Sequence, residues 1–242
     1  MVKFNLLKLV IDFGNSRVKL ALFSNKDLVT TKTIKLFSKK EVIGFCGDST
    51  ISSSIYSTVR KLTDSEKKLL SSLNCIELNN DTPLPISSVY ESFVGSDRIA
   101  AVVGATFLFP NKDIWVFDSG SCLTADFIDK EKKYHGGRIT LGLKMRYKAL
   151  SDYTSNLPLI NQQDYTPFKG KNTKNSIVSG VQSGILSEVK TLISEWKQEN
   201  KDFIVLFTGG DVSFFEKELK SSIFADPFLV LKGLNEILDY NE

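Results

Sequence analysis

The chain has 242 residues, of which 42% are hydrophobic, enough to build the core of one large domain or of two small ones. Its 31 basic and 28 acidic residues give a net charge of +3, and this near balance offers no electrostatic case for a nucleic-acid partner. No apolar run approaches the ~20 residues that span a bilayer, and the first residues lead into a strand pattern rather than into the core of a signal peptide. We therefore expect a cytoplasmic protein that does not insert into a membrane.

Cysteine and histidine usage excludes two further classes of site. The three cysteines, Cys46, Cys75 and Cys122, are odd in number and widely spaced, and His135 is the only histidine. Such a pattern predicts buried, reduced thiols. Neither a disulfide framework nor a metal site built from cysteine and histidine is expected.

The first predicted feature is a β-hairpin over residues 9–23. Its first strand ends on Asp12, and Gly14 allows backbone N–H groups to approach an anion closely. The turn and the returning strand add three further donors: Asn15, Ser16 and Lys19. Because Asp12 would repel a phosphate unless a cation lay between them, the pattern favours a Mg²⁺-nucleotide. An ordinary hairpin turn can have the same residues, so this motif alone does not distinguish a phosphate-binding turn from a structural one.

The next stretch is expected to be mostly structural. Strands are predicted over residues 28–36 and 49–58, and a capped helix begins at Thr63. Further on, Gly95 and Ser96 lead into a small-residue helix whose first turn contains Asp97 and Arg98. An acid there is favoured by the helix dipole, so Asp97 can be structural. Alternatively, the adjacent acid and base can bind a substrate that has both a hydroxyl and a carboxylate.

A second hairpin repeats the design of the first about half a chain later. Residues 114–121 form a strand that ends in Asp118-Ser119-Gly120-Ser121, and a returning strand follows with Thr124. The repetition indicates internal duplication. It predicts an N-terminal domain at 1–112 and a C-terminal domain at 113–242.

The remaining pattern fits this second domain. We expect helices over residues 143–154, 175–199 and 211–220, and a buried strand over 203–207. A final helix over 228–240 can pack back on the first domain.

Two hairpins of this kind resemble the shared plan of the acetate kinase, sugar kinase, Hsp70 and actin superfamily. That resemblance implies an α/β fold of two tandem ribonuclease H-like (actin-like ATPase) domains with a nucleotide cleft between them. More specifically, the motifs match those of type III pantothenate kinases in order and spacing, over essentially the whole chain. The matching motifs are residues 11–16, 95–98, 118–121 with Thr124 and Asp126, 136–142, 171–173, 179–181, 207–210 and 229–235.

This resemblance implies an activity and its site. A type III pantothenate kinase phosphorylates pantothenate with ATP to 4′-phosphopantothenate, the first committed step toward coenzyme A. Asp97 would be the general base. The other implied substrate-binding residues are Tyr90, Gly95, Ser96, Arg98 and Thr173.

The resemblance also implies ligands for the nucleotide and its cations. Asp12 would hold Mg²⁺, directly or through water, and Asp118 would bind a monovalent cation, K⁺ or NH₄⁺. The implied ATP and phosphate contacts are Asp12, Gly14, Asn15, Ser16, Lys19, Gly120, Ser121, Thr124, Gly209 and Gly210. Members of the family are homodimers, so the implied partners are pantothenate and a second copy of the chain.

Some positions depart from the family pattern. Ser16 and Ser121 stand where threonine is usual, and both keep the hydroxyl group. Leu141 replaces a usual proline, and the segment from Tyr90 to Gly95 is shorter than is typical. Two alternatives remain: another small-molecule kinase or nucleotide hydrolase on the same fold, and a non-catalytic regulatory relative. The chain has all three acids that the reaction would use, Asp12, Asp97 and Asp118, and this argues against a non-catalytic relative.

Overall fold

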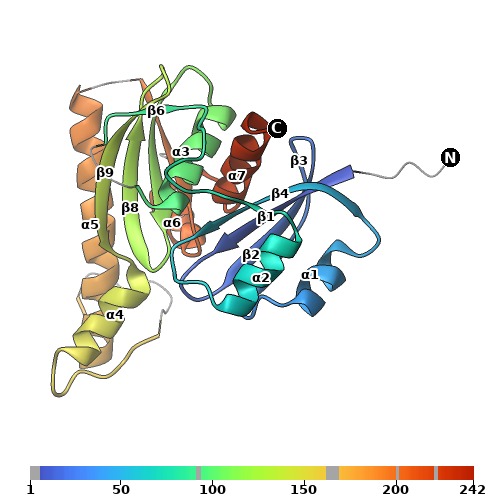
Figure 1. The fold of residues 1–242 in the computed structure, drawn as a ribbon. Helices are drawn as coiled ribbons and strands as arrows, with labels where there is room; N and C mark the ends of the chain where they lie inside the picture. The colour runs from blue at the N-terminus through green and yellow to red at the C-terminus, as the bar shows by residue number, and fades with distance from the viewer. Residues whose placement is uncertain (1–5, 91–93, 162–168, 200–201, 221–222) are drawn as a thin grey trace. The chain divides into compact units, whose positions relative to one another are not determined.

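The computed structural model describes residues 6–90, 94–161, 169–199, 202–220 and 223–242 (Figure 1). The chain divides into two compact units. The first contains residues 1–111, 131–135 and 228–242, and the second contains residues 112–130 and 136–227. That the chain is built from two domains divided at residues 112 and 113 stays a prediction.

The first unit is built on a five-stranded mixed sheet with the strand order β3-β2-β1-β4-β5. β1, β2 and β3 form an antiparallel meander, as the hairpin pattern predicts, whereas β4 and β5 join in parallel. The strands are β1 (Leu6–Phe13), β2 (Val18–Ser24), β3 (Asp27–Ile34), β4 (Thr50–Thr58) and β5 (Ile76–Glu77).

Side-chain alternation along β1 divides this sheet into two faces. Leu9, Ile11 and Phe13 are fully buried in one apolar core together with residues of α1 (Lys39–Cys46) and α2 (Asp64–Ser72). The intervening Asp12 therefore points to the opposite face. On that face, α7 (Leu229–Tyr240) packs against β1 and β4, and α3 (Ser96–Leu108) packs against β4.

Two glycines bring α3 and α7 into close contact, and Figure 1 shows these helices side by side. A Cβ atom added to Gly233 would lie 1.7 Å from the carbonyl oxygen of Ala100, and one added to Gly104 would lie 2.6 Å from that of Leu229. The backbones of the two helices therefore touch where neither residue has a side chain. The expected return of the last helix to the N-terminal part of the chain is observed.

In the described residues, the strands of the second unit have the order β11-β10-β7-β8-β9, with β9 belonging to this unit from residue 136 onward. β7 and β8 form the second predicted hairpin, and β10 pairs with β7 in parallel. The strands are β7 (Asp113–Ser119), β8 (Cys122–Ile128), β9 (Lys133–Leu141), β10 (Phe203–Thr208) and β11 (Phe224–Ala225). The short β6 (Ser87–Ser88) pairs with Lys133 and Tyr134 at the start of β9, residues that belong to the first unit.

Helices α4 (Leu143–Asp152), α5 (Thr173–Glu199) and α6 (Val212–Leu219) complete the second unit and its core. Trp196 of α5 stacks on Trp115 of β7 with ring centroids 3.4 Å apart, and Phe117 stacks on Phe207 of β10. Trp196 is therefore a core residue. Across the described parts of the chain, none of the helices is both long enough and apolar enough to cross a bilayer.

Candidate active site

The first group of predicted site residues gathers at the ends of three neighbouring strands. Asp12 near the end of β1 is 8% exposed and lies opposite Lys19 of β2 and Ser57 of β4 in the strand registers. The Ser57 hydroxyl donates a hydrogen bond of 3.0 Å to Asp12 Oδ1. Residues opposite each other in a sheet point to the same face. Three polar side chains thus share the α3 and α7 face of the sheet, and two of them, Asp12 and Ser57, are buried.

The electrostatics of Asp12 favour a bound cation. Burial raises the pKa of the Asp12 carboxyl, the positive charge of Lys19 and the Ser57 hydrogen bond lower it, and the negative charge of Asp97 raises it further. A buried carboxylate with a second carboxylate nearby is costly unless positive charge is supplied. The residues present therefore fit a Mg²⁺-nucleotide better than a bare phosphate.

The turn after Asp12 is open to a ligand. β1 ends at Phe13 and β2 begins at Val18, so the chain reverses through Gly14, Asn15 and Ser16. Gly14 is partly exposed, and the other two are exposed. The predicted phosphate contacts of the first hairpin therefore all lie at the same end of the β1–β2 pair, in or beside its connecting turn.

The predicted base lies at the beginning of α3. Asp97 is in the first turn, is partly exposed, and accepts a hydrogen bond of 2.8 Å at Oδ1 from the backbone N–H of Arg98. The negative charge of Asp97 raises the pKa of Asp12, so the two carboxylates are close enough to interact electrostatically. Ser96, which comes just before Asp97, is buried and donates a hydrogen bond of 3.1 Å to the carbonyl oxygen of Thr58.

Arg98 and Tyr90 form the predicted substrate side of this group. Arg98 is only 6% exposed, and its guanidinium carbon lies 5.7 Å from the centre of the Tyr90 ring. Tyr90 is 38% exposed and also contacts the ring of Tyr134 at 5.9 Å. The shortened segment expected between Tyr90 and Gly95 includes residues 91–93, which lie outside the described residues.

The second group of predicted residues surrounds the turn between β7 and β8. Asp118 lies opposite Thr124 in the register of this hairpin, and Ser119 ends β7. The hydroxyl oxygens of Ser119 and Thr124 are buried and make no hydrogen bond with any residue that the structure describes. Buried hydroxyl oxygens ordinarily have partners. Thr124 lies opposite Asp118 in the register and so shares its face of the hairpin, where the carboxylate and hydroxyl oxygens suit a hard cation. Ser119 follows Asp118 along β7, so its side chain points to the other face.

Two further chain segments form backbone hydrogen bonds with the β7–β8 turn. The N–H of Gly142, just before α4, donates to the carbonyl oxygen of Ser121 at 3.1 Å, and the N–H of Asp211 donates to that of Ser119 at 3.0 Å. Gly209 has φ of +99°, and a Cβ atom there would lie 2.4 Å from Asp118 Oδ1. Only glycine fits such a backbone so close to a carboxylate. Gly209 of the predicted Gly209-Gly210 turn is therefore brought to Asp118 and to the backbone of Ser119.

Sequence reasoning missed three polar residues of these two groups: Ser57, Ser119 and Asp211. Asp211 is 6% exposed; burial raises the pKa of its carboxyl, and the positive charge of Lys144 lowers it. Its position directly after two glycines and before a helix was an available signal. Thr173, predicted to lie near the substrate, is the exposed first residue of α5.

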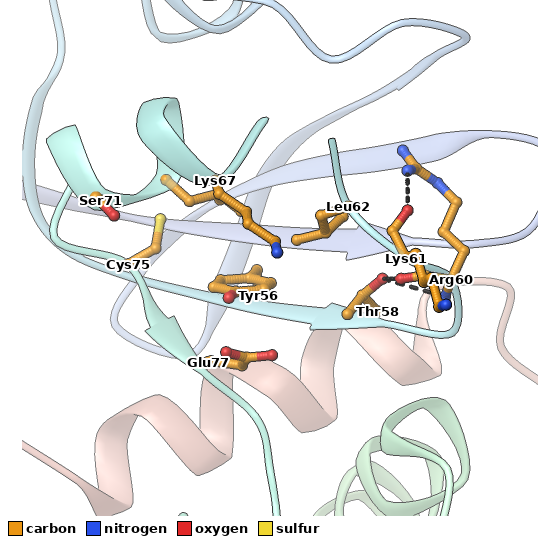
Figure 2. Close-up of a pocket in the computed structure, with 10 residues that line it drawn as sticks. Tyr56, Thr58, Arg60, Lys61, Leu62, Lys67, Ser71, Cys75 and Glu77 are labelled. Atoms are coloured by element: carbon orange, nitrogen blue, oxygen red, sulfur yellow. Dashed lines mark hydrogen bonds between the residues drawn. The ribbon is translucent and has the colours of Figure 1, made fainter. Parts of the chain in front are cut away.

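A cavity of about 680 Å³ lies on the other face of the first unit's sheet, between β4, β5 and α2 (Figure 2). Tyr56 and Thr58 line it, and charged side chains of Arg60, Lys67 and Glu77 surround it. Because these strand residues alternate with Ser57, the cavity and the Asp12 carboxylate are on opposite faces. The cavity is therefore separate from the predicted phosphate site.

A family model of type III pantothenate kinases matches residues 8–195 of the chain. The chain belongs to the type III pantothenate kinase family. It is 40% identical over 240 residues to the type III pantothenate kinase of Phocaeicola vulgatus, with 98% of this chain and 99% of the relative covered. The family assignment expected from the motifs is confirmed.

Solved structures show the fold that the type III pantothenate kinase motifs imply. A Campylobacter jejuni protein assigned to the Baf family of transcriptional activators has a TM-score of 0.63 at 24% identity, with 96% of this chain and 98% of that chain covered. A glucokinase from an Antarctic psychrotroph has a TM-score of 0.55 at 10% identity, with 99% and 100% covered. The expected α/β fold of the actin-like ATPase and sugar kinase class is confirmed. That both residue groups face one cleft stays a prediction.

Proposed function

We propose that this chain phosphorylates the primary hydroxyl of pantothenate with ATP, giving 4′-phosphopantothenate for coenzyme A biosynthesis. The family match over most of the chain supports this activity. The observation within the structure that carries it is the placement of Asp97 at the start of α3, in electrostatic reach of the buried Asp12. Phosphoryl transfer to an alcohol needs one acid to accept the hydroxyl proton and one to hold the nucleotide's cation.

Asp97 is the group that accepts the substrate proton in this proposal. The hydroxyl becomes strongly acidic only as its bond to phosphorus forms, so a carboxylate is basic enough to take the proton late in the reaction. Asp97 is partly exposed, whereas Asp12 is nearly inaccessible. Asp97 is therefore the acid that a substrate hydroxyl can reach more easily.

Asp12, Lys19 and the open turn between them hold the nucleotide's phosphates. Mg²⁺ in kinases is bound by one or two carboxylates together with phosphate oxygens, and the single carboxylate of Asp12 fits that pattern. Bound there, Mg²⁺ would neutralise phosphate charge. Lys19 adds a fixed positive charge, and Gly14, Asn15 and Ser16 present N–H and side-chain donors.

Arg98 binds the carboxylate of pantothenate, and Tyr90 covers its apolar part. The ring of Tyr90 next to the guanidinium limits the directions in which Arg98 can turn. A nearly buried guanidinium forms strong hydrogen bonds to a carboxylate. Thr173 is the remaining proposed substrate contact, with Gly95 and Ser96 shaping the loop.

Asp118 holds the monovalent cation in the second unit. The hydroxyl oxygen of Thr124 is a buried acceptor that lacks a hydrogen bond within the described chain, and it lies opposite this carboxylate in the strand register. Oxygen ligands of this kind suit K⁺ or NH₄⁺. Gly120 and Ser121, together with the Gly209-Gly210 turn, contribute the remaining phosphate contacts.

We further propose a homodimer that acts in the cytoplasm. Large apolar side chains are exposed along β9, α4 and the segment that follows: Ile139, Leu141, Met145, Tyr153 and Leu159. Exposed apolar residues that recur along one stretch are typical of an interaction surface. Leu141, which replaces the family's usual proline, is one of them.

A substrate panel tests the proposed activity. ADP release is measured with pantothenate and with alcohols that lack its carboxylate or its terminal hydroxyl. Among these compounds, we expect only pantothenate to give rapid ADP release. Release with a different alcohol would instead identify another small-molecule kinase, and no release with any of them, together with retained ATP binding, would favour a non-catalytic relative.

A further inference from the structure

The end of β4 contacts both parts of the first residue group. Ser57 donates its hydroxyl to Asp12 Oδ1 at 3.0 Å. The carbonyl oxygen of the next residue, Thr58, accepts the Ser96 hydroxyl at 3.1 Å. Val59 then donates its N–H to the carbonyl oxygen of Phe13 at 3.1 Å, at the beginning of the phosphate turn. Three consecutive residues thus bind the nucleotide turn and the start of α3.

These contacts are well shielded from solvent. Ser57 is 0% exposed, Ser96 is 4% exposed, and Asp12 is 8% exposed. Hydrogen bonds in such surroundings are strong, and leaving one of their partners without a bond is costly. The segment is also anchored beyond the site, because Arg60 forms a two-pronged ion pair with Glu66 at the start of α2.

We propose that residues 57–59 form the positioning element of the reaction, in which the Ser57 hydroxyl fixes the orientation of the Asp12 carboxylate. This inference rests on the proposed function. The hydrogen bond to Oδ1 sets the rotation of the carboxylate and leaves its second oxygen as the one that would be available to the nucleotide's cation. The bond from Ser96 to Thr58 fixes the start of α3, and with it the neighbouring Asp97, relative to β4.

Like charge explains why such an element is needed. Asp12 and Asp97 repel each other across this site, and without fixed contacts the two carboxylates would move apart or rotate. In-line transfer tolerates little misplacement, since an error of about 1 Å can cost roughly 10²-fold in rate. Ser57 touches neither the substrate hydroxyl nor its phosphate donor in this account, so it is a positioning residue.

Ser57→Ala tests the proposal, and Ser54→Ala is its matched control. Ser54 lies on the same strand, is 2% exposed, and also donates one hydrogen bond, to the carbonyl oxygen of Leu73 at 3.0 Å. Both substitutions remove one buried hydroxyl, but only Ser57 contacts an acid of the site. We expect Ser57→Ala to lower kcat by roughly 10- to 100-fold and to raise the Mg²⁺ concentration needed for half-maximal rate, with little change in the KM for pantothenate.

The hydroxyl itself is tested by rescue. Ser57→Thr keeps the donor and should recover most of the rate, whereas Ser57→Cys keeps the shape with a weak donor and should not. If the Ala variant fails to fold, the kcat and Mg²⁺ dependence of Ser57→Cys test the role of the hydroxyl in its place. Equal kcat and equal Mg²⁺ dependence for the Ser57 and Ser54 variants would overturn the proposal.

A binding measurement separates this proposal from the proposed function. Calorimetric titration with ATP at several Mg²⁺ concentrations reports on Asp12 without any phosphoryl acceptor. We expect the Mg²⁺ dependence of ATP binding to weaken in Ser57→Ala and to remain unchanged in Ser54→Ala. If the wild type bound Mg²⁺-ATP but did not phosphorylate pantothenate, the proposed activity would be wrong. The binding measurement would still show whether Ser57 orients Asp12.

Discussion

Among single residues, Asp97 has two competing explanations that one substitution separates. It sits in the first turn of α3, where an acid stabilises a helix, and it also lies near Asp12. A structural acid at this position contributes up to about 1 kcal/mol. A general base contributes roughly 10²–10⁴-fold in rate.

Asp97→Asn should therefore lower kcat by at least two decades while pantothenate and ATP still bind. The amide keeps the shape of the side chain but removes the basic charge. Steady-state kinetics and thermal unfolding of the same preparation check both consequences. Asp64→Asn, which changes an acid in the first turn of α2, should leave kcat intact. Turnover close to wild type in a folded Asp97→Asn protein would show that this acid is structural.

Asp118 gives the second prediction at this scale. If its carboxylate and the Thr124 hydroxyl hold a monovalent cation, activity at saturating Mg²⁺ should rise with K⁺ or NH₄⁺ and be low in Na⁺ alone. Asp118→Asn should weaken that dependence, because the site loses its only charged ligand. Initial rates across a salt series at constant ionic strength measure both effects. Identical rates in Na⁺ and K⁺ buffers would exclude the cation site.

At the scale of elements, the sequence predicted the hairpins well because their signals are local. Alternation, the acids at strand ends and the glycines of both turns all lie within a few residues of one another. The bond from Ser57 to Asp12 joins residues 45 positions apart and exists only because β4 pairs in parallel with β1. Nothing near Ser57 in the sequence indicates that pairing. The contact of Asp211 with the β7–β8 turn likewise depends on the parallel pairing of β10 with β7.

The beginning of α2 depends on one ionised side chain. The Glu66 carboxylate accepts hydrogen bonds from Arg60 and from the backbone N–H of Thr63. The backbone N–H of Glu66 in turn donates to the Thr63 hydroxyl, which completes a capping box. The hydrogen bonds from Arg60 are the main reason that the pKa of Glu66 falls from 4.5 to about 2. A folded-state pKa below the unfolded value means that the stabilisation is present above pH 4.5 and is lost as the pH falls toward 2.

Glu66→Gln should consequently destabilise the protein by ~2–3 kcal/mol near neutral pH. The difference from wild type should shrink as the pH is lowered from about 5 to 2, since the wild-type carboxylate becomes neutral there. Urea unfolding at a series of pH values measures this. Asp64→Asn, an exposed acid of the same turn, should give a much smaller difference. A Glu66→Gln effect that did not change with pH would contradict the ion pair as its cause.

The contact between α3 and α7 makes the second prediction at the scale of elements. Gly233→Ala would place a methyl group 1.7 Å from the Ala100 carbonyl oxygen, so the helices must separate, at a cost of roughly 1–3 kcal/mol or more. Gly44→Ala in α1 is the control, because no atom lies within 4 Å of its added Cβ. That variant should be neutral or stabilised by up to about 1 kcal/mol. Equal unfolding free energies for the two variants would contradict the close contact.

For the whole molecule, the family and the fold class followed from the sequence, whereas the assembly remains a proposal. We expect a particle of twice the chain mass of 27.1 kDa in sedimentation equilibrium. Replacing two exposed apolar residues, Leu141→Lys with Met145→Lys, should shift it to the monomer, since charges are disfavoured at the centre of an interface. The same pair of changes at Leu36 and Ile43, exposed in the first unit, should leave the dimer intact. A monomeric wild type at working concentration would rule out the dimer.

The docking of α7 on the first unit also has a consequence during synthesis on the ribosome. Residues 112–227 are translated before residues 229–240, so the polypeptide of the second unit is complete while α3 still lacks its partner helix. Until then the small-residue face of α3, with Gly104 at its centre, has no covering helix. Domains generally fold in order from the N-terminus during synthesis. Here the first unit to emerge is the last that can finish folding, and ribosome-bound chains that end before residue 228 should remain open to proteases at α3.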